Sequence, residues 1–206
     1  MNKLDLSTIV QIDFPANQYV QEVTEKTQIV LHHSAGWDNA RGMFEYWSTN
    51  KQRVATAIGI TDDGTITQGY STKYWGWHIG AGHSNLEKHS IGIEICNWGP
   101  LTFKQGKFIS WAGAEVPREK VQEYDQKFRG SLFYEKYTAQ EIESVVKLLE
   151  FWHREYGIPI HYNTSMWNVS TAALIGSPGV WTHVSFRDDK SDCHPYPPLI
   201  EALKSL

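Results

Sequence analysis

Two short apolar runs constrain the fold of this 206-residue chain more than any other feature. The segments Gln28–His33 and 90–96 are rich in isoleucine, valine and leucine, and polar residues flank both of them. Runs of this length are typical of buried strands, whereas a buried helix needs about ten or more residues. We therefore expect at least two strands inside a packed layer.

A β-hairpin is predicted between these two strands. Residues 54–61 and 65–69 stand on either side of the dipeptide Asp63-Gly64. An Asp-Gly pair favours the tight turn whose backbone twist matches that of two antiparallel strands. The two segments are thus expected to pair with each other.

Helical segments alternate with these strands. Residues 38–51 open with an acidic cap and carry apolar residues at helical spacing. The clearest helix follows Thr138, which forms a capping box with Glu141, and it is expected to end near Gly157. A short closing helix is expected over residues 198–206. This alternation of strands and helices is typical of an α/β fold.

The segment from about residue 99 to 137 interrupts the pattern with glycines, charged residues and scattered aromatic residues. No repeat, low-complexity tract or linker divides the sequence. We expect one domain over residues 1–206, in which residues 99–137 are a polar insertion that lies over one side.

Composition and charge exclude several classes of partner. The net charge is −4, and the basic residues are scattered, which disfavours nucleic acid. The N-terminus lacks the apolar core of a signal peptide, and no stretch approaches the length of a membrane span. We expect a soluble chain made in the cytoplasm, without membrane insertion. Nine tryptophans suit core packing and also stacking on sugar rings.

Polar residues interrupt the apolar strands at two places, although a packed fold normally avoids this. The first is the pair His32-His33, of which only one can enter a given site because side chains alternate along a strand. The second is Glu94, which shares a strand face with Gly92 and Cys96, opposite the isoleucines. Gly92 is expected to leave space beside this carboxylate for a substrate groove.

The third polar feature is the segment 183–194, which is rich in His, Asp and Lys. A catalytic zinc site needs three nitrogen, oxygen or sulfur ligands and leaves a fourth position for water. His32 and His183, together with either Asp192 or Cys193, would meet this need. Taken alone, the same segment could also be a solvated loop. The two cysteines do not form a disulfide framework, so Cys193 is available as a thiol.

In their order and spacing, four segments resemble the zinc-dependent N-acetylmuramoyl-L-alanine amidases. This family includes phage lysozyme-type endolysins, muropeptide-recycling amidases and peptidoglycan recognition proteins. The segments are 31–36, 90–94, 182–183 and 190–192, supported by Asp63-Gly64 and by 77–81, which looks like the family's Trp-His-Ala-Gly loop. The resemblance covers roughly residues 25–200. It implies a central mixed sheet flanked by helices on both faces, from which the insertion departs.

The resemblance implies that a zinc ion is held by His32 and His183. The third ligand of the family is an Asp or Cys two residues after a catalytic Lys, and the count from Lys190 gives Asp192. Cys193 is the alternative, because it lies ten residues after His183, a separation found in the Asp-type members. We favour Asp192, since local loop geometry sets the shorter offset while the longer one tolerates an insertion or deletion.

Some members of the family use a catalytic Tyr on the second strand, but the matching residues here, 54–58, contain none. This places the general base on Glu94, which would take a proton from the attacking water and return it to the leaving amine. Lys190 would stabilise the oxyanion. His78 and Trp77 are the candidate substrate contacts.

The resemblance also implies the reaction and its substrate. Peptidoglycan or a muropeptide would be cut at the amide between the lactyl group of N-acetylmuramic acid and L-alanine. We expect a monomeric, phage-type endolysin that leaves the cytoplasm through a membrane pore and acts on the wall. The alternatives are a cytoplasmic muropeptide-recycling amidase and a non-catalytic peptidoglycan-binding module, and the retained His32, His183, Glu94 and Lys190 argue against the second.

Overall fold

The computed structural model describes residues 4–36, 39–82 and 84–206. Six strands form the central sheet in the order β1-β4-β3-β5-β2-β11. The strands are β1 (Val10–Gln11), β2 (Gln28–His33), β3 (Ile58–Ile60), β4 (Ile66–Gln68), β5 (Ser90–Ile95) and β11 (Gly179–Thr182). Strands β3 and β4 pair antiparallel, and the other neighbours pair in parallel. The sheet is therefore mixed, as expected.

The two strands expected from the apolar runs lie side by side in the middle of this sheet. Every residue of β2 and of β5 is buried. They pair in parallel, from Gln28 opposite Ser90 to His33 opposite Ile95. Burial on both faces explains why these strands read as continuous apolar runs.

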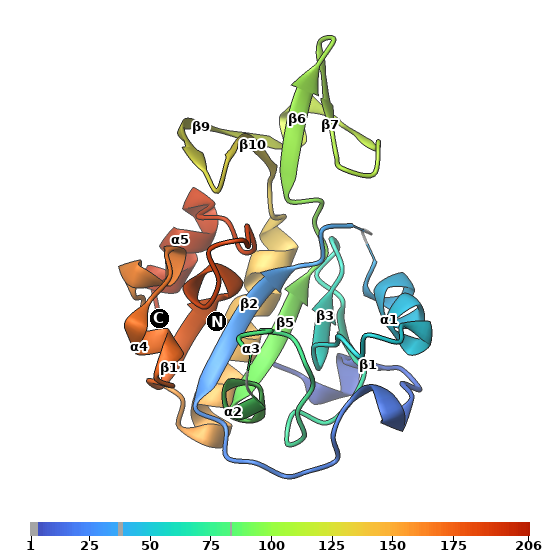
Figure 1. Ribbon diagram of the computed structural model, residues 1–206, viewed down its shortest axis with the longest axis vertical. Coiled ribbons are helices and arrows are strands. Elements are labelled where there is room, and N and C mark those ends of the chain that lie inside the picture. Colours follow the sequence, from blue (N-terminus) through green and yellow to red (C-terminus); the bar gives the residue numbers. More distant parts are fainter. Residues whose placement is uncertain (1–3, 37–38, 83) are drawn as a thin grey trace.

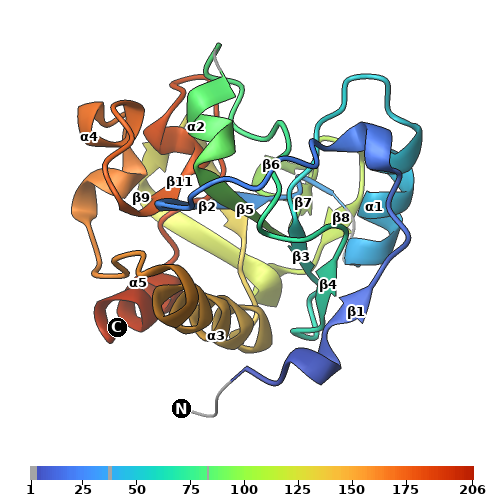
Figure 2. The ribbon, with the colours of Figure 1, turned by 90° about the horizontal axis from the view of Figure 1, so that it is seen from below.

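Helices cover both faces of the sheet, which confirms the expected α/β architecture. The helices α3 (Ala139–Tyr156) and α5 (Pro197–Lys204) lie on one face, while α1 (Ala40–Thr49) and α2 (Ser84–Lys88) lie on the other (Figure 2). A further short helix, α4 (Thr171–Leu174), stands beside β11 (Figure 1).

The helix boundaries follow from local sequence signals. The side chains and backbone of Thr138 and Glu141 form the expected capping box, and α3 ends at Gly157, whose φ of 70° is left-handed. The side chain of Asn39 caps α1 by accepting from the amide of Gly42. The acidic cap expected at Asp38 lies outside the described residues.

The hairpin forms around Asp63-Gly64, but its first strand is shorter than expected. Residues 54–57 lie outside β3, and the first two of them pair elsewhere: Val54 bridges to Trp77, and the amide of Ala55 donates to the carbonyl of Trp77 at 3.0 Å. This part of the chain therefore pairs with the loop that precedes α2 and does not extend the β3–β4 hairpin.

The segment expected as a polar insertion forms a second sheet. Its five strands pair antiparallel in the order β8-β7-β6-β10-β9. It stands beyond the carboxyl ends of β2 and β5, at the upper end of the molecule in Figure 1. The strands are β6 (Pro100–Lys104), β7 (Lys107–Ile109), β8 (Glu115–Val116), β9 (Val121–Phe128) and β10 (Ser131–Glu135).

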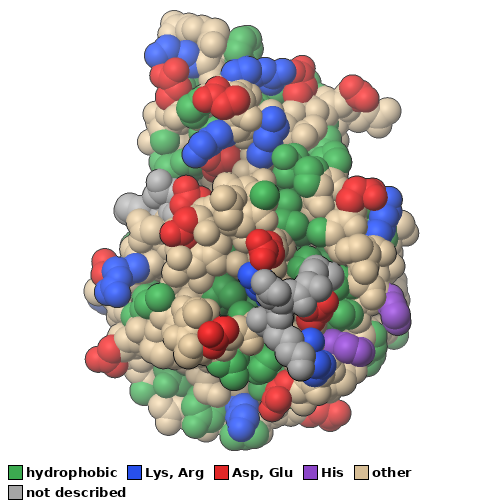
Figure 3. Space-filling model, turned by 180° about the vertical axis from the view of Figure 1, so that it is seen from behind, with side chains coloured by type: hydrophobic (Ala, Val, Ile, Leu, Met, Phe, Trp, Pro, Cys, Tyr) green, Lys and Arg blue, Asp and Glu red, His purple; other side chains and the backbone are tan. Residues whose placement is uncertain are grey.

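Charged side chains of both signs lie on the surface of the molecule. On the face seen in Figure 3, acidic and basic side chains are interspersed rather than gathered by sign. Across the described ranges, no helix combines the length and the apolar character that crossing a membrane requires.

Candidate metal centre

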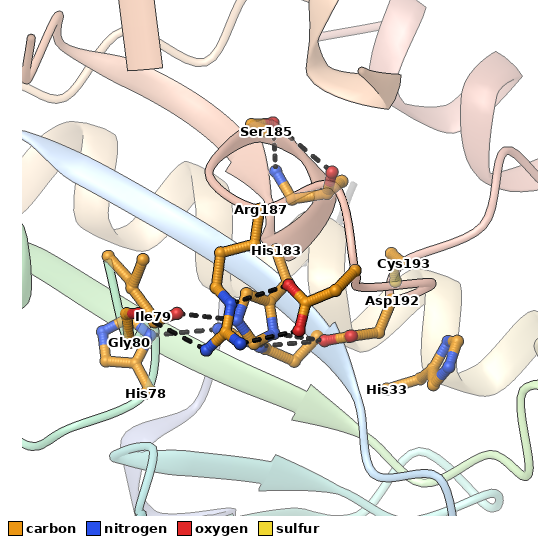
Figure 4. Close-up of polar contacts among 12 residues, drawn as sticks. His33, His78, Ile79, Gly80, His183, Ser185, Arg187, Asp192 and Cys193 are labelled. Atoms are coloured by element: carbon orange, nitrogen blue, oxygen red, sulfur yellow. Dashed lines mark hydrogen bonds and ion pairs between the residues drawn. The ribbon is translucent and has the colours of Figure 1, made fainter. Parts of the chain in front are cut away.

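Three side chains from distant parts of the chain converge at the carboxyl end of the central sheet. His32 Nδ1 lies 3.1 Å from His183 Nδ1 and 3.1 Å from Asp192 Oδ2, and the last two atoms are 2.9 Å apart. Ligands in a tetrahedral zinc site, with bonds of about 2.0 Å, stand about 3.3 Å from one another. The three atoms therefore form a triangle of the size that one such ion spans. Figure 4 shows two of these side chains, His183 and Asp192, directed toward each other.

His32 reaches this cluster because of strand alternation. It is the fifth residue of β2, on the face opposite to that of Leu31 and His33. His33 points away from the cluster and its Nδ1 lies 3.2 Å from the hydroxyl of Tyr137 (Figure 4). The expectation that only one of the two histidines enters the site is thus met.

His183 and Asp192 are brought together by a folded loop. His183 begins a 3₁₀ turn (His183–Ser185) at the end of β11, and Thr182 and Ser185 cap this turn reciprocally. The amide of Val184 donates to the carbonyl of Asp192 at 3.1 Å. This bond closes the loop and places the carboxylate over the turn.

A backbone carbonyl fixes the tautomer of His183. Its Nε2 lies 2.9 Å from the carbonyl oxygen of Ile79. A carbonyl can only accept, so Nε2 carries the hydrogen and Nδ1 presents its lone pair to the cluster. Such an outer contact is usual for a histidine that binds a metal.

His32 is oriented by a chain of hydrogen bonds that ends at another carbonyl. The hydroxyl of Ser90 donates to the carbonyl of Glu87 at 3.4 Å, and Ser90 Oγ lies 2.9 Å from His78 Nε2. His78 Nδ1 in turn lies 3.0 Å from His32 Nε2. Because the Ser90 hydroxyl donates to the carbonyl, it accepts from His78 Nε2–H. His78 Nδ1 then accepts from His32 Nε2–H, which leaves the lone pair of His32 Nδ1 free to bind a cation.

His78 was expected to contact substrate, but the structure places it behind His32. Only 2% of its side chain is exposed, so its ring has no surface to offer a substrate. Gly92 makes room for it: a Cβ at this position would stand 3.0 Å from His78 Nδ1 and 2.6 Å from a methyl of Thr56. The space expected to form a substrate groove is filled by these two side chains, so that expectation is wrong.

A buried carboxylate organises the loop that supports both histidines. Glu87 is 1% exposed and accepts hydrogen bonds from the amides of His78, Ile79 and Gly80, at 2.8–3.2 Å. Its own carbonyl receives the Ser90 hydroxyl. Sequence reasoning missed Glu87 and Ser90, because nothing in their local pattern marks a buried carboxylate or the amides that it binds.

The ionisation states of the cluster suit a cation. Burial, followed by the neighbouring His183, lowers the pKa of His32 to about 3, which keeps the imidazole neutral near pH 7. Burial alone would raise the pKa of Asp192, but His183 and His32 override it and hold this pKa well below its usual range. Two imidazoles and a carboxylate form a donor set typical of zinc.

Glu94 lies beside the cluster with one oxygen unsatisfied. It pairs with His32 across β2 and β5 and therefore shares its face. Within the described chain, Glu94 Oε2 is buried and has no hydrogen-bond partner. Burial, then the charge of Asp192, raises the pKa of Glu94 well above its usual range, while Lys190 acts in the opposite direction. Lys190 itself is half-buried.

The two candidates for the third ligand point in different directions. Asp192 belongs to the triangle, whereas the buried thiol of Cys193 accepts a hydrogen bond from the hydroxyl of Tyr137 at 3.0 Å (Figure 4). Trp77, the other expected substrate contact, is half-buried and packs edge-on against Trp75.

A second buried group lies on the far side of the Asp192 loop. The ring of His194 stacks between Tyr134 and Tyr137, with centroid distances of 4.7 and 4.5 Å. His194 Nδ1 lies 2.7 Å from the hydroxyl of Tyr124, and Nε2 lies 2.9 Å from the carbonyl of Glu135. These contacts join the loop of Asp192 to β9 and β10 of the insertion.

Several solved structures share this fold. PlyL is 17% identical, with a TM-score of 0.57 over 95% of this chain and 96% of PlyL. The catalytic domain of XlyA is 19% identical, with a TM-score of 0.57 over 96% of this chain and 97% of that domain. The N-acetylmuramoyl-L-alanine amidase LysC from Clostridium intestinale URNW is 16% identical, with a TM-score of 0.54 over 96% and 95%.

At these identities the likeness establishes the fold. No match was found among curated proteins. A family model described as N-acetylmuramoyl-L-alanine amidase matches residues 23–195, which include all three converging side chains. The chain belongs to the N-acetylmuramoyl-L-alanine amidase family.

Proposed function

We propose that the chain is a zinc-dependent endolysin-type hydrolase that cuts the amide between N-acetylmuramic acid and L-alanine in intact peptidoglycan. The observation that carries this proposal is the triangle of His32, His183 and Asp192, with edges of 2.9–3.1 Å, beside the unsatisfied oxygen of Glu94. A binding module would need neither the triangle nor the carboxylate.

The triangle fits a zinc ion by its donor atoms, its size and its fixed tautomers. His32 Nδ1, His183 Nδ1 and Asp192 Oδ2 would hold the ion, and Cys193 would not take part. When bound, zinc supplies Lewis acidity toward a carbonyl and toward water. His78 and the carbonyl of Ile79 hold the two imidazoles in position.

Glu94 is the proposed general base. Its carboxylate accepts a proton from the attacking water and returns it to the nitrogen of the leaving L-alanine. A raised pKa suits the first half of this exchange, because a carboxylate that is a stronger base takes the proton of the water more readily. Overall, one water is consumed, the lactyl carbonyl becomes a carboxylate, and alanine leaves as an amine.

Lys190 is the proposed oxyanion partner. The charge of Lys190 lowers the pKa of the Glu94 carboxyl, which supports a place for its ammonium near the proposed site. A positive charge there stabilises the oxygen that becomes negative as the amide carbon turns tetrahedral.

The choice of intact wall as substrate rests on the structural relatives. They include a protein titled as a mutant endolysin from Bacillus subtilis, 17% identical with a TM-score of 0.57 over 96% of both chains. The alternative substrate is a soluble muropeptide.

The test incubates the zinc-loaded protein with purified sacculi and, separately, with a soluble N-acetylmuramoyl peptide. New alanine amines without new reducing sugars are expected from the sacculi. Cleavage of the soluble peptide alone would make the protein a muropeptide amidase. Binding to sacculi with no new amines would contradict the enzymatic proposal.

A further inference from the structure

A groove lies next to the proposed catalytic site, between α1 and the insertion. It has a volume of about 380 Å³ and is lined by Ser34–Gly36, by one face of α1, and by Trp98 and Trp111. Trp111 sits in the turn between β7 and β8. The groove is therefore a feature that the insertion completes.

The residues that line the groove connect to the proposed catalytic residues at two places in the fold. Ser34 lines it and follows His32 by two residues, so the chain leads directly from the ligand to the groove. Met43 of α1 also lines it, and this side chain packs over Gly59, which pairs with Glu94 across β3 and β5. The groove therefore lies beside the proposed catalytic site.

Two exposed aromatic rings face the groove from opposite walls. The exposed fraction is 75% for Trp111, on the insertion, and 59% for Tyr46, on α1. Below them, Trp47 is 8% exposed and packs edge-on against Phe44. Large aromatic rings left open to water have a free apolar face, and such faces suit the flat faces of sugar rings.

The exposed ring of Trp111 is held in place. Its indole Nε1–H donates a hydrogen bond to the carbonyl of Ala35, on the loop that leaves β2. Ala35 adopts a left-handed backbone with φ of 53°, which is unfavourable for a residue with a side chain. A ring fixed in this way loses little conformational freedom when a ligand stacks on it.

The chemistry of the lining favours a neutral ligand. Of the described residues that line the groove, none carries a charge. A peptide with free carboxylates would have no cation to meet there, whereas an N-acetylated sugar is neutral and has one apolar face.

We propose that this groove binds an N-acetylhexosamine unit of the glycan strand, next to the muramic acid whose amide is cut, with Trp111 and Tyr46 as stacking platforms. The inference rests on the proposed function for its choice of polymer. It assigns the insertion a role in recognising the glycan and leaves the cleavage chemistry to the central sheet.

The first experiment compares two substrates. We expect Trp111→Ala and Tyr46→Ala each to lower the ratio of kcat/KM on sacculi to kcat/KM on a single-sugar N-acetylmuramoyl peptide by roughly tenfold, equivalent to about 1.4 kcal/mol. Phe103→Ala is the matched control, because Phe103 is 53% exposed on the same insertion and does not line the groove. An unchanged ratio in the groove variants, or an equal loss in the control, would overturn the proposal.

The second experiment does not depend on amide cleavage. Binding of an N-acetylglucosamine tetrasaccharide is measured by calorimetry for the wild type, Trp111→Ala and Phe103→Ala, after thermal unfolding has shown that all three are folded. We expect the affinity to fall roughly tenfold in Trp111→Ala and to stay unchanged in Phe103→Ala. If the wild type does not bind the tetrasaccharide, the proposal that the groove binds glycan is refuted. If it binds the tetrasaccharide but does not cleave sacculi, the proposed function is refuted and the glycan-binding proposal is retained.

Discussion

The central sheet and the sheet of the insertion are built in opposite ways. Strands β2 and β5 are parallel, buried on both faces and covered by helices. The insertion is antiparallel, and its small core comprises four buried residues, Leu101, Phe108, Val116 and Val121. A core of this size stabilises little by itself, so the insertion depends on contacts with the rest of the molecule.

The two sheets are expected to set different properties of the protein. The proposed ligands, Glu94 and the hydrogen bonds that support them all lie on the central sheet or its loops, where dense packing holds atoms in place. The insertion contributes exposed aromatic rings, and the stacking of His194 on Tyr134 and Tyr137 is one of the contacts that anchor it. Changes to the central sheet should therefore abolish chemistry, whereas changes to the insertion should tune it.

The largest effect is expected from removal of the metal. A strong chelator should abolish activity while the thermal unfolding transition persists, because the central sheet has its own core. Zinc content, amide cleavage and unfolding are measured on the same sample, and added zinc should restore the activity. Full activity in protein assayed to be free of metal would refute the zinc proposal.

Exchange of the two candidate ligands comes next. Asp192→Ala should lose zinc and activity, since it removes one corner of the triangle. Cys193→Ser should retain most of both, because its thiol faces Tyr137. Metal analysis and turnover on one muropeptide decide between them, and the reverse pattern would make Cys193 the ligand.

Glu94→Gln tests the proposed proton transfer and leaves the three proposed metal ligands unchanged. The amide keeps the size of the carboxylate but cannot accept the proton, so turnover should fall by about 10²–10⁴-fold with normal zinc content. The comparison requires zinc analysis and cleavage rates for both proteins. Near-normal turnover would show that Glu94 is not the base, and lost zinc would show that it supports the metal site.

Glu87→Gln tests the support of the central site. The new NH₂ group must face amides that now donate to a carboxylate, so the loop of residues 78–80 should shift. We expect zinc affinity to fall by about 10–100-fold, as is usual for outer contacts of metal ligands. Competition with a chromophoric chelator measures this, and unchanged affinity would mean that the loop holds its position without Glu87.

The smallest effect is expected from the anchor of the insertion. Tyr124→Phe removes the 2.7 Å contact with His194 and should lower the free energy of unfolding by about 1 kcal/mol. Zinc affinity should change by less than about fivefold. A loss of affinity like that expected for Glu87→Gln would mean that the two regions are not separable.

Apolar runs predict the two central strands, and alternation along β2 separates His32 from His33. The choice of Asp192 comes from the family resemblance, through the offset from Lys190, and the structure places this side chain in the triangle. The role of Glu87 could not be predicted, because its partners are backbone amides that every residue carries.

The strands of the insertion were missed because their turns lack the usual signal. Gln105-Gly106 and Arg129-Gly130 connect β6 to β7 and β9 to β10, and all four residues have positive φ. Such two-residue turns normally carry Asn or Asp in the first position. A Gln or Arg there hides the hairpin from sequence patterns.

The two ends of the insertion lie next to each other. Its first and last strands pair Pro100 with Tyr134, so the segment enters and leaves the central body at neighbouring points. A cassette joined in this way can be lengthened, shortened or exchanged without moving β2 or β5. Preference for a particular wall can then evolve in the cassette, while the hydrolytic machinery beneath it stays the same.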